Sequence, residues 1–255
     1  HVYEAELALD TEGIFLGLRT RNITNIGAYY TTDRATLGAL SNLGCMAATY
    51  RTPAIFVEAS GVLTNTQSTG PYRGAGRPES AYLIETMIDA AARELDLDGV
   101  EIRRRNTISA DAMPFKTGLT YTYDSGDFIK NLEDGITRAD YDGFPARRET
   151  SNKAGKLRGI SVVNVVEEAA RARLEMSEIR FDASGRATLL MGTSDHGQGH
   201  ETSFKQILSD QLGLDIDNIR YKDSDTDIAA GGTGTFGSRS MTLGGTAITI
   251  AAQKL

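Results

Sequence analysis

Three short glycine-rich segments are the strongest constraint in this sequence. They occupy residues 70–77, 195–200 and 231–238, and a helix-like pattern follows each of them. The first N–H groups of a helix have no partner inside it, so together with the helix dipole they attract anions. Glycine also lacks the Cβ that would block a close approach of the backbone. Three such loops predict a large, anionic ligand held mostly by backbone groups.

The common phosphate-loop patterns do not describe these segments. None continues as Gly-Lys-Ser/Thr, which excludes a Walker loop. Gly197 and Gly199 lack the third glycine of the dinucleotide fingerprint. Two interpretations stay open for each loop: a ligand-binding segment, or a tight turn from a strand into a helix.

Alternating and β-branched stretches predict one hairpin in each half of the chain. The paired segments are 2–9 with 14–21, and 174–181 with 186–192. Two further strands are expected, at 55–64 and 157–167. Apolar residues at helical spacing predict helices over 78–97, 99–106 and 126–140, and after the second and third glycine loops.

The order of these elements predicts an α+β fold of two lobes, each a mixed β-sheet with packed helices. Residues 141–156 are polar, contain Pro145 and lack an apolar face, which is typical of a connection between lobes. We therefore predict a first lobe at 1–145 and a second at 146–255. Hairpin, glycine loop and helix recur in both halves, and internal duplication remains an open alternative.

Charge and composition exclude several classes of protein. The chain has 27 Lys and Arg against 34 Asp and Glu, a net charge of −7, which argues against a nucleic-acid binder. No apolar run reaches the ~18 residues of a membrane span, so none is expected. A single cysteine, Cys45, excludes an internal disulfide, and with only three histidines we assign no metal ligands.

Two polar side chains of the second loop each allow two interpretations. Gln198 carries both donors and an acceptor, so it suits a heterocycle edge or a phosphate, or else it caps its own loop. His200 is either a general base or, as we favour, a helix-start histidine near solvent.

Basic residues and the cysteine are treated in the same way. Arg73 and Arg77 flank Gly-Ala-Gly and either clamp an anion or form surface ion pairs. Residues 103–105, three consecutive arginines, are most simply a solvated helix end. Cys45 is interpreted as a buried small hydrophobic residue rather than a nucleophile.

The three loops together resemble those of a known family. Residues 70–79 (GPYRGAGRPE) are similar to the active-site loop of the molybdenum-binding large subunit in the xanthine dehydrogenase and aerobic carbon monoxide dehydrogenase family. Residues 195–202 (DHGQGHET) resemble its Gly-Gln-Gly cofactor loop, and 234–240 (GTFGSRS) resemble its third cofactor loop. The chain is thus identified as a member of this family of molybdenum hydroxylases, which are oxidoreductases.

The resemblance implies a fold of the molybdopterin cofactor-binding domain type. In that family the dithiolene of molybdopterin, often as the cytosine dinucleotide, holds the molybdenum, so no protein thiolate or imidazole is required. Arg73 and Gly74 are then the candidate catalytic residues, beside the metal and the substrate. The implied cofactor contacts are Tyr72, Arg73, Gly74, Gly197, Gln198, Gly199, His200, Thr202, Gly237, Ser238, Arg239 and Ser240.

Two departures from the family pattern narrow the substrate. Carbon monoxide dehydrogenases carry copper on a cysteine of the first loop, where this chain has Gly74. Purine-oxidising members use an upstream arginine, where this chain has Phe56. The resemblance therefore implies hydroxylation of an aldehyde or an N-heterocycle by a carbon-monoxide-dehydrogenase-like subunit.

We expect the chain to be a fragment, because it starts at His1 and stops inside an apolar stretch. The family's general base, a glutamate, is expected beyond Leu255, and the fragment alone is expected to be inactive. The resemblance implies iron–sulfur clusters and FAD on partner subunits, a small-molecule substrate and a cytoplasmic location. The alternative is a non-catalytic phosphate- or nucleotide-binding module, and a third interpretation makes the glycine loops mere turns of a structural lobe.

Overall fold

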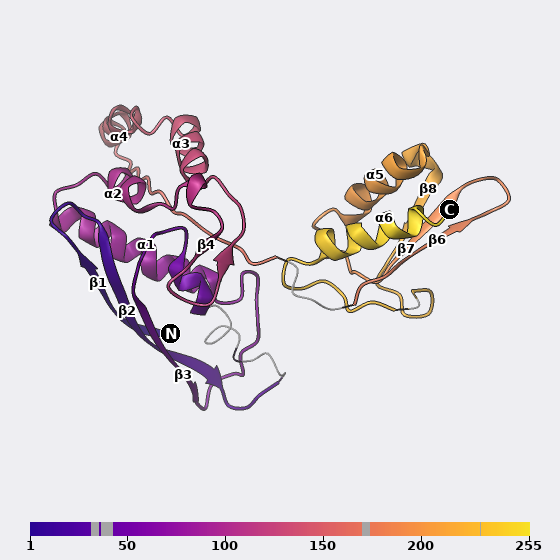
Figure 1. Ribbon diagram of the computed structural model, residues 1–255, viewed down its shortest axis with the longest axis horizontal. Coiled ribbons are helices and arrows are strands. Elements are labelled where there is room, and N and C mark those ends of the chain that lie inside the picture. Colours follow the sequence, from indigo (N-terminus) through magenta and orange to yellow (C-terminus); the bar gives the residue numbers. More distant parts are fainter. Residues whose placement is uncertain (32–35, 37–42, 170–173, 230) are drawn as a thin grey trace. The chain divides into compact units, whose positions relative to one another are not determined.

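The computed structural model describes residues 1–31, 36, 43–169, 174–229 and 231–255. It divides into two compact units, residues 1–166 and 167–255, each of which is described by itself (Figure 1). Each unit combines a mixed sheet with helices, so the predicted α+β class is confirmed. The lobe boundary at residues 145–146 falls inside a helix of the first unit and stays a prediction.

The first unit is built on a three-stranded sheet in the order β1–β2–β3. The predicted hairpin is confirmed, since β1 (Val2–Leu9) pairs antiparallel with β2 (Phe15–Gly27). β3 (Ile55–Leu63) pairs parallel with β2. Burial alternates along β1, because successive side chains of a strand point to opposite faces. One face therefore contributes to the core, and the other carries exposed side chains such as Phe56.

A long helix, α1 (Arg77–Glu94), packs on the inner face of this sheet. Pro78 stands in its first turn, where the fixed φ of proline suits a helix start. Leu83, Ile84 and Ile88 share one core with apolar side chains of β1 and β2. Each such buried side chain contributes about 1.5–3 kcal/mol. The core thereby fixes the helix that directly follows the first glycine loop.

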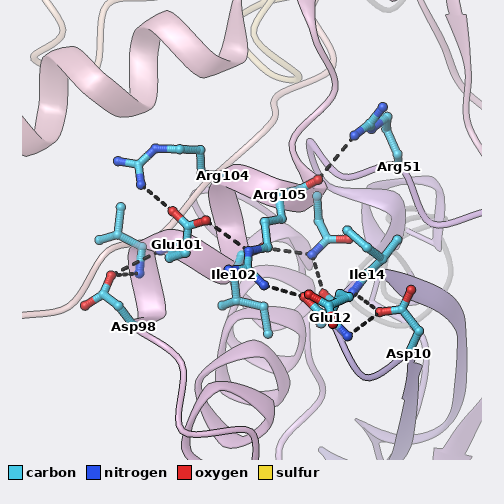
Figure 2. A network of polar contacts seen from close by, with 12 residues as sticks. Asp10, Glu12, Ile14, Arg51, Asp98, Glu101, Ile102, Arg104 and Arg105 are labelled. Carbon is cyan, nitrogen blue, oxygen red and sulfur yellow. Dashed lines mark hydrogen bonds and ion pairs between the residues drawn. The ribbon is translucent and has the colours of Figure 1, made fainter.

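A second helix, α2 (Gly99–Asn106), is tied to the hairpin turn (Figure 2). The Asp98 side chain caps its first turn by accepting two backbone N–H groups. At the other end, Arg105 Nη1 donates to the carbonyl oxygen of Glu12 at 2.6 Å. Asn106 Nδ2 donates to the carbonyl oxygen of Gly13 at 2.8 Å. The turn is thus held by side chains more than ninety positions away in sequence.

The expectation that residues 103–105 form a solvated helix end is wrong for Arg103. Its side chain faces α1, where Nε donates to Glu85 at 2.8 Å and Nη2 pairs with Asp89 at 2.8 Å. Arg104 and Arg105 are partly exposed and pair with acidic side chains. A run of like residues in a helix covers several faces, so one member points inward.

Shorter elements complete the first unit. They are η2 (Leu43–Ala47), η3 (Ala110–Ala112), β4 (Phe115–Lys116), β5 (Thr122–Tyr123), α3 (Phe128–Arg138) and α4 (Phe144–Lys153). Cys45 lies buried in η2, so its interpretation as a buried small residue is confirmed. The polar stretch 141–156 contains the helix α4, which buries Phe144 and Ser151 and carries Pro145 in its first turn.

The second unit repeats the mixed strand arrangement. β6 (Ser177–Phe181) pairs antiparallel with β7 (Ala187–Met191), and β8 (Ile219–Lys222) pairs parallel with β7. The helix α5 (His200–Leu212) joins β7 to β8 through η4 (Ile216–Asn218), and the π-helix η5 (Ser240–Gly245) runs into α6 (Thr246–Ala252). α5 and α6 lie side by side against the sheet (Figure 1). Leu189, Phe204, Leu208 and Ile248 form the centre of this core.

The strand predicted at 157–167 is absent from the structure, which describes all of these residues. The segment pairs with no other strand and is held by side chains instead. Asn164 N donates to Glu85 at 3.2 Å, and Asn164 Nδ2 donates to the Tyr50 hydroxyl at 3.2 Å. Alternating apolar residues therefore marked an extended segment rather than a member of a sheet.

Candidate functional site

The second glycine loop, residues 195–200, follows β7 and leads into α5, and one carboxylate organises it. Asp195 Oδ1 accepts from Gly197 N at 2.6 Å and Gln198 N at 3.1 Å. Asp195 Oδ2 accepts from His200 N at 2.9 Å. These hydrogen bonds, above all that from Gly197, hold the pKa of Asp195 below its usual range. Three amides that were expected to face a ligand therefore face Asp195.

The backbone of the loop next to the start of α5 is nevertheless uncovered. Gly197 and Gly199 have φ of +96° and +80°, and no atom lies within 4 Å of where their Cβ atoms would be. Glycine is thus required here for backbone conformation rather than for lack of space. Thr202, a predicted cofactor contact, is exposed in the first turn of α5. Two N–H groups of that turn are already used, since His200 N donates to Asp195 and Ser203 N donates to Gly199 O, so those of Glu201 and Thr202 are the donors left for a ligand.

Gln198 is exposed and makes contacts within its own loop. Its Oε1 accepts from His196 N, and its Nε2 donates to the carbonyl oxygen of Ser194 at 3.3 Å. The same Nε2 lies 3.1 Å from His200 Nε2. The side chain thus caps its own loop, which is one of the two interpretations given for Gln198. Its amide is also exposed, so a ligand can reach it.

His200 is buried, so the expectation of a histidine near solvent is wrong. Only 6% of the residue is exposed, because its ring packs against Phe204 with the centroids 4.9 Å apart. An amide nitrogen only donates, so His200 Nε2 accepts from Gln198 and Nδ1 is the donor nitrogen of the ring. Nδ1 is buried and has no hydrogen-bond partner among the residues that the structure describes. It is a donor of the kind that a polar ligand satisfies.

Residues 192–194, which link β7 to the second loop, contact the backbone of the third loop. A Cβ at Gly192, which follows β7, would lie 2.6 Å from Gly232 Cα, and Gly234 N donates to the carbonyl oxygen of Gly192 at 3.1 Å. Thr235 Oγ1 accepts from Ser194 N at 3.0 Å and donates to Ser194 O at 2.7 Å. No side chain fits between the two loops, so both present their outer surfaces together.

Four predicted cofactor residues end the third loop. Arg239 is wholly buried, and its guanidinium donates to Glu175 and to the carbonyl oxygens of Gly234 at 2.7 Å and Leu174 at 3.0 Å. Ser240 is buried, with Oγ 3.0 Å from Thr235 Oγ1. The other two, Gly237 with φ of +59° and Ser238 with φ of +53°, lie at the loop surface. Arg239 therefore orders the loop, and the neighbouring backbone is what remains accessible.

The first loop belongs to the first unit and ends at the start of α1. Tyr72 is 85% exposed, and Arg73 is exposed beside it. Gly74 has φ of +84°, and a Cβ there would lie 2.7 Å from the Pro78 ring. Arg77 is buried, and its Nη1 donates to Gly74 O at 3.4 Å. The ring and the arginine together fix the backbone of this loop.

The residues present in the second unit fit a long, polar, acceptor-rich group such as molybdopterin. The fit rests on the unpartnered buried Nδ1 of His200 and on the open faces of glycines in both loops. A Cβ at Gly197, Gly199, Gly234 or Gly237 would extend into open space, where it would cover the loop backbone. We therefore take the joined loops as the candidate cofactor site.

Comparison with known families decides the assignment. Two family models match the chain, both described as a molybdopterin cofactor-binding domain, over residues 1–107 and 134–255. The chain belongs to the molybdopterin cofactor-binding domain family. The resemblance carried by the three glycine loops is thereby confirmed, as is the fold type that it implied.

The relatives of this chain are longer proteins, and it matches only a part of each. The chain is 32% identical to the 6-hydroxypseudooxynicotine dehydrogenase complex subunit gamma of Paenarthrobacter nicotinovorans, over 96% of this chain and 31% of that protein. It is 33% identical to the carbon monoxide dehydrogenase large chain of Hydrogenophaga pseudoflava, over 99% of this chain and 33% of that protein. The structure of quinoline 2-oxidoreductase from Pseudomonas putida 86 superposes with a TM-score of 0.89 at 29% identity, over 99% of this chain and 34% of that chain. The chain thus spans about a third of the length of these relatives.

Two residues that organise the second and third glycine loops were missed in the sequence. Asp195 stands two positions before Gly197, a spacing typical of an Asx turn, so its role was open to prediction. Glu175 lies just before β6 and reaches Arg239 from 64 positions away. No local pattern marks such a long-range pair.

Proposed function

We propose that this chain is the part of a molybdenum hydroxylase catalytic subunit that binds the molybdopterin cofactor. The observation that carries the proposal is the contact of Gly192, which lies just before the second loop, with Gly232 of the third loop, because each of these loops has glycines open to solvent. The family assignment supports molybdopterin as the group that they hold. When bound, this cofactor supplies the two-electron oxidation that hydroxylates an electron-poor carbon.

The chain's own residues divide into two sets in this proposal. Gln198, His200 and the first turn of α5 donate hydrogen bonds to polar groups of the cofactor, and the outer backbone at Gly237 and Ser238 does the same. Two adjacent loops suit a long group, so we propose the cytosine dinucleotide form. Arg73 and Gly74 of the first loop lie beside the substrate and the metal.

We propose an aldehyde or an N-heterocycle as the substrate. Two of the relatives carry the names of a pseudooxynicotine dehydrogenase subunit and a quinoline oxidoreductase, which supports an N-heterocycle or a related compound. The likeness to carbon monoxide dehydrogenase does not extend to copper, because residues 70–77 contain no cysteine. Cys45, the single cysteine of the chain, is buried in η2.

Partners and location are also part of the proposal. The relatives' names include a complex subunit gamma and a large chain, which supports partner subunits that carry iron–sulfur clusters and FAD. Within the described part of the chain, every helix is too short or too polar to cross a lipid bilayer. We propose a cytoplasmic enzyme.

Cofactor content of the purified intact protein tests the proposal. Elemental analysis should find molybdenum, the fluorescence of oxidised pterin should find an equal amount of pterin, and acid hydrolysis should release a cytosine nucleotide. Turnover is then measured with aldehydes and N-heterocycles and an artificial electron acceptor. Absence of both molybdenum and pterin, with a nucleotide that protects the chain from proteolysis, would instead establish a nucleotide-binding module.

A further inference from the structure

One buried ion pair lies where the second and third loops meet. The carboxylate of Glu175 pairs with the guanidinium of Arg239, and their side chains are 1% and 0% exposed. Removing two charges from water has a large free-energy cost that only good geometry and further hydrogen bonds offset. The surrounding backbone must therefore hold the two side chains at a distance and orientation that keep the ion pair and its hydrogen bonds intact.

The carboxylate of Glu175 is enclosed by glycine backbone from both loops. A Cβ at Gly192 would lie 2.3 Å from Glu175 Oε1, and a Cβ at Gly232 would lie 2.6 Å from the same oxygen. Met176 N donates to this oxygen at 3.0 Å. The two glycines thus leave the space that the carboxylate fills, and any larger residue at either position would displace it.

Arg239 carries the constraint from Glu175 into the third loop. Its Nη1 donates to the carbonyl oxygen of Gly234 as well as to Glu175, and Nη2 donates to Leu174 O. Gly234 in turn donates through its N–H to Gly192. The planar guanidinium makes several directed hydrogen bonds at once, so it fixes the backbone of residues 234–239 against the end of β7.

We propose that Glu175 is the positioning residue of the cofactor site: its buried carboxylate holds Arg239 and so keeps the second and third loops in the one arrangement in which both contact the cofactor. This inference rests on the proposed function. In this proposal Glu175 does not contact the cofactor, because its carboxylate is enclosed by Gly192, Gly232 and Arg239. Its effect on cofactor retention is exerted through the loops.

The test is Glu175→Gln in the intact subunit, which keeps the shape of the side chain and removes its charge. We expect the molybdenum and pterin content of the folded protein to fall at least about tenfold, since a buried arginine loses its charged partner. In the protein stripped of cofactor, we expect faster hydrogen exchange at the amides of Gly234 and Ser194, which join the two loops. Should this variant not accumulate, Glu175→Asp, which retracts the carboxylate by one methylene, is measured in the same way.

Two matched variants separate positioning from general stability. Glu178→Gln removes an exposed acidic partner of Arg180 in the same hairpin and should leave both cofactor content and exchange unchanged. Leu208→Ala weakens the core of the same unit, and at equal folded fraction it should retain its cofactor. An equal loss of cofactor in Leu208→Ala and Glu175→Gln would overturn the inference.

The remaining outcomes distinguish this inference from the proposed function. A wild-type protein that holds molybdopterin, together with a Glu175→Gln variant that holds as much and shows unchanged exchange, overturns the positioning role alone. A wild-type protein without molybdopterin overturns the proposed function and this inference with it. Loss of cofactor with faster exchange in the glutamine variant, and neither in the two controls, establishes the positioning role.

Discussion

Arg103 Nε donates to a carboxylate oxygen of Glu85 at 2.8 Å, and the two side chains are only 2% and 5% exposed. The Tyr50 hydroxyl donates to the same carboxylate at 2.7 Å, and Arg103 Nη1 donates to Gly99 O at 2.7 Å. Such a pair persists in a low-dielectric interior only because both charges are also hydrogen bonded to other groups. α1 and α2 are thus joined by two charges, each of which depends on the other.

We predict that Arg103→Met lowers the free energy of unfolding by about 3–5 kcal/mol, because it leaves the Glu85 carboxylate buried and unpaired. Urea unfolding followed by circular dichroism measures this. The matched control is Arg104→Met, since Arg104 pairs with Glu101 and Glu133 at a partly exposed surface and should lose only about 0–1 kcal/mol. Equal losses in the two variants would contradict the buried-pair account.

Local patterns predicted much of the fold. The antiparallel hairpin of β1 and β2 follows from strand alternation around a turn, and α1 follows from apolar residues at helical spacing after Pro78. Each signal is local, because the residues that carry it are close to one another in the sequence. The segment 157–167 shows the limit, since its alternation matches a strand but no strand in the described part of the chain pairs with it.

Burial of polar residues was what the sequence did not reveal. Arg103 was expected in solvent and His200 near it, yet both are buried: Arg103 faces α1, and His200 packs against Phe204 of its own helix. Glu175 carried no signal at all, although it reaches the third loop. The glycine loops could be recognised because the backbone conformation that requires glycine is set within a few residues. The charged side chains that stabilise these loops are brought together only by the tertiary fold.

The next prediction concerns the first loop and enzyme turnover. Gly74→Val should reduce it at least about tenfold, or roughly 1.4 kcal/mol in the barrier, because positive φ and a clash with the Pro78 ring distort the loop. Molybdenum content should stay near normal, since we propose that the second and third loops retain the cofactor. Gly70→Val is the control, because no atom lies within 4 Å of a Cβ there and the φ of Gly70 is not positive. Unchanged turnover in Gly74→Val would place this loop away from the substrate.

Gln198→Ala should lower cofactor content rather than rate alone. The amide is exposed beside the start of α5. Loss of its hydrogen bond should weaken the binding free energy of the cofactor by about 1–3 kcal/mol, which lowers retention at least about fivefold. Molybdenum and pterin are measured per folded subunit, with Gln206→Ala on the exposed face of α5 as the control. Wild-type occupancy in Gln198→Ala would show that this amide only caps its own loop.

Asp195 predicts a pH response of the second loop. Its pKa in the folded chain lies below the usual value of 3.8, because the ionised carboxylate accepts N–H groups of Gly197, Gln198 and His200. A carboxylate whose folded pKa is lowered stabilises the fold above its unfolded pKa, and this contribution is lost as the pH falls through the folded value. The loop should therefore stay closed above pH 3.8 and open only as the pH falls through the folded pKa, which lies below that value.

Amide chemical shifts of the loop measure this opening. Those of Gly197 and His200 should titrate together with a midpoint below pH 3.8, and a midpoint at or above that value would contradict the lowered pKa. Asp195→Asn should abolish the titration and speed exchange of both amides at neutral pH, because an asparagine offers one acceptor oxygen and turns its NH₂ group toward an N–H donor. Asp182→Asn is the control: Asp182 also has a lowered pKa, chiefly through the Ser184 hydroxyl, but it lies in the turn between β6 and β7. Its replacement should alter that turn and leave the titration of Gly197 and His200 in place, since Asp182 accepts no hydrogen bond from the glycine loop.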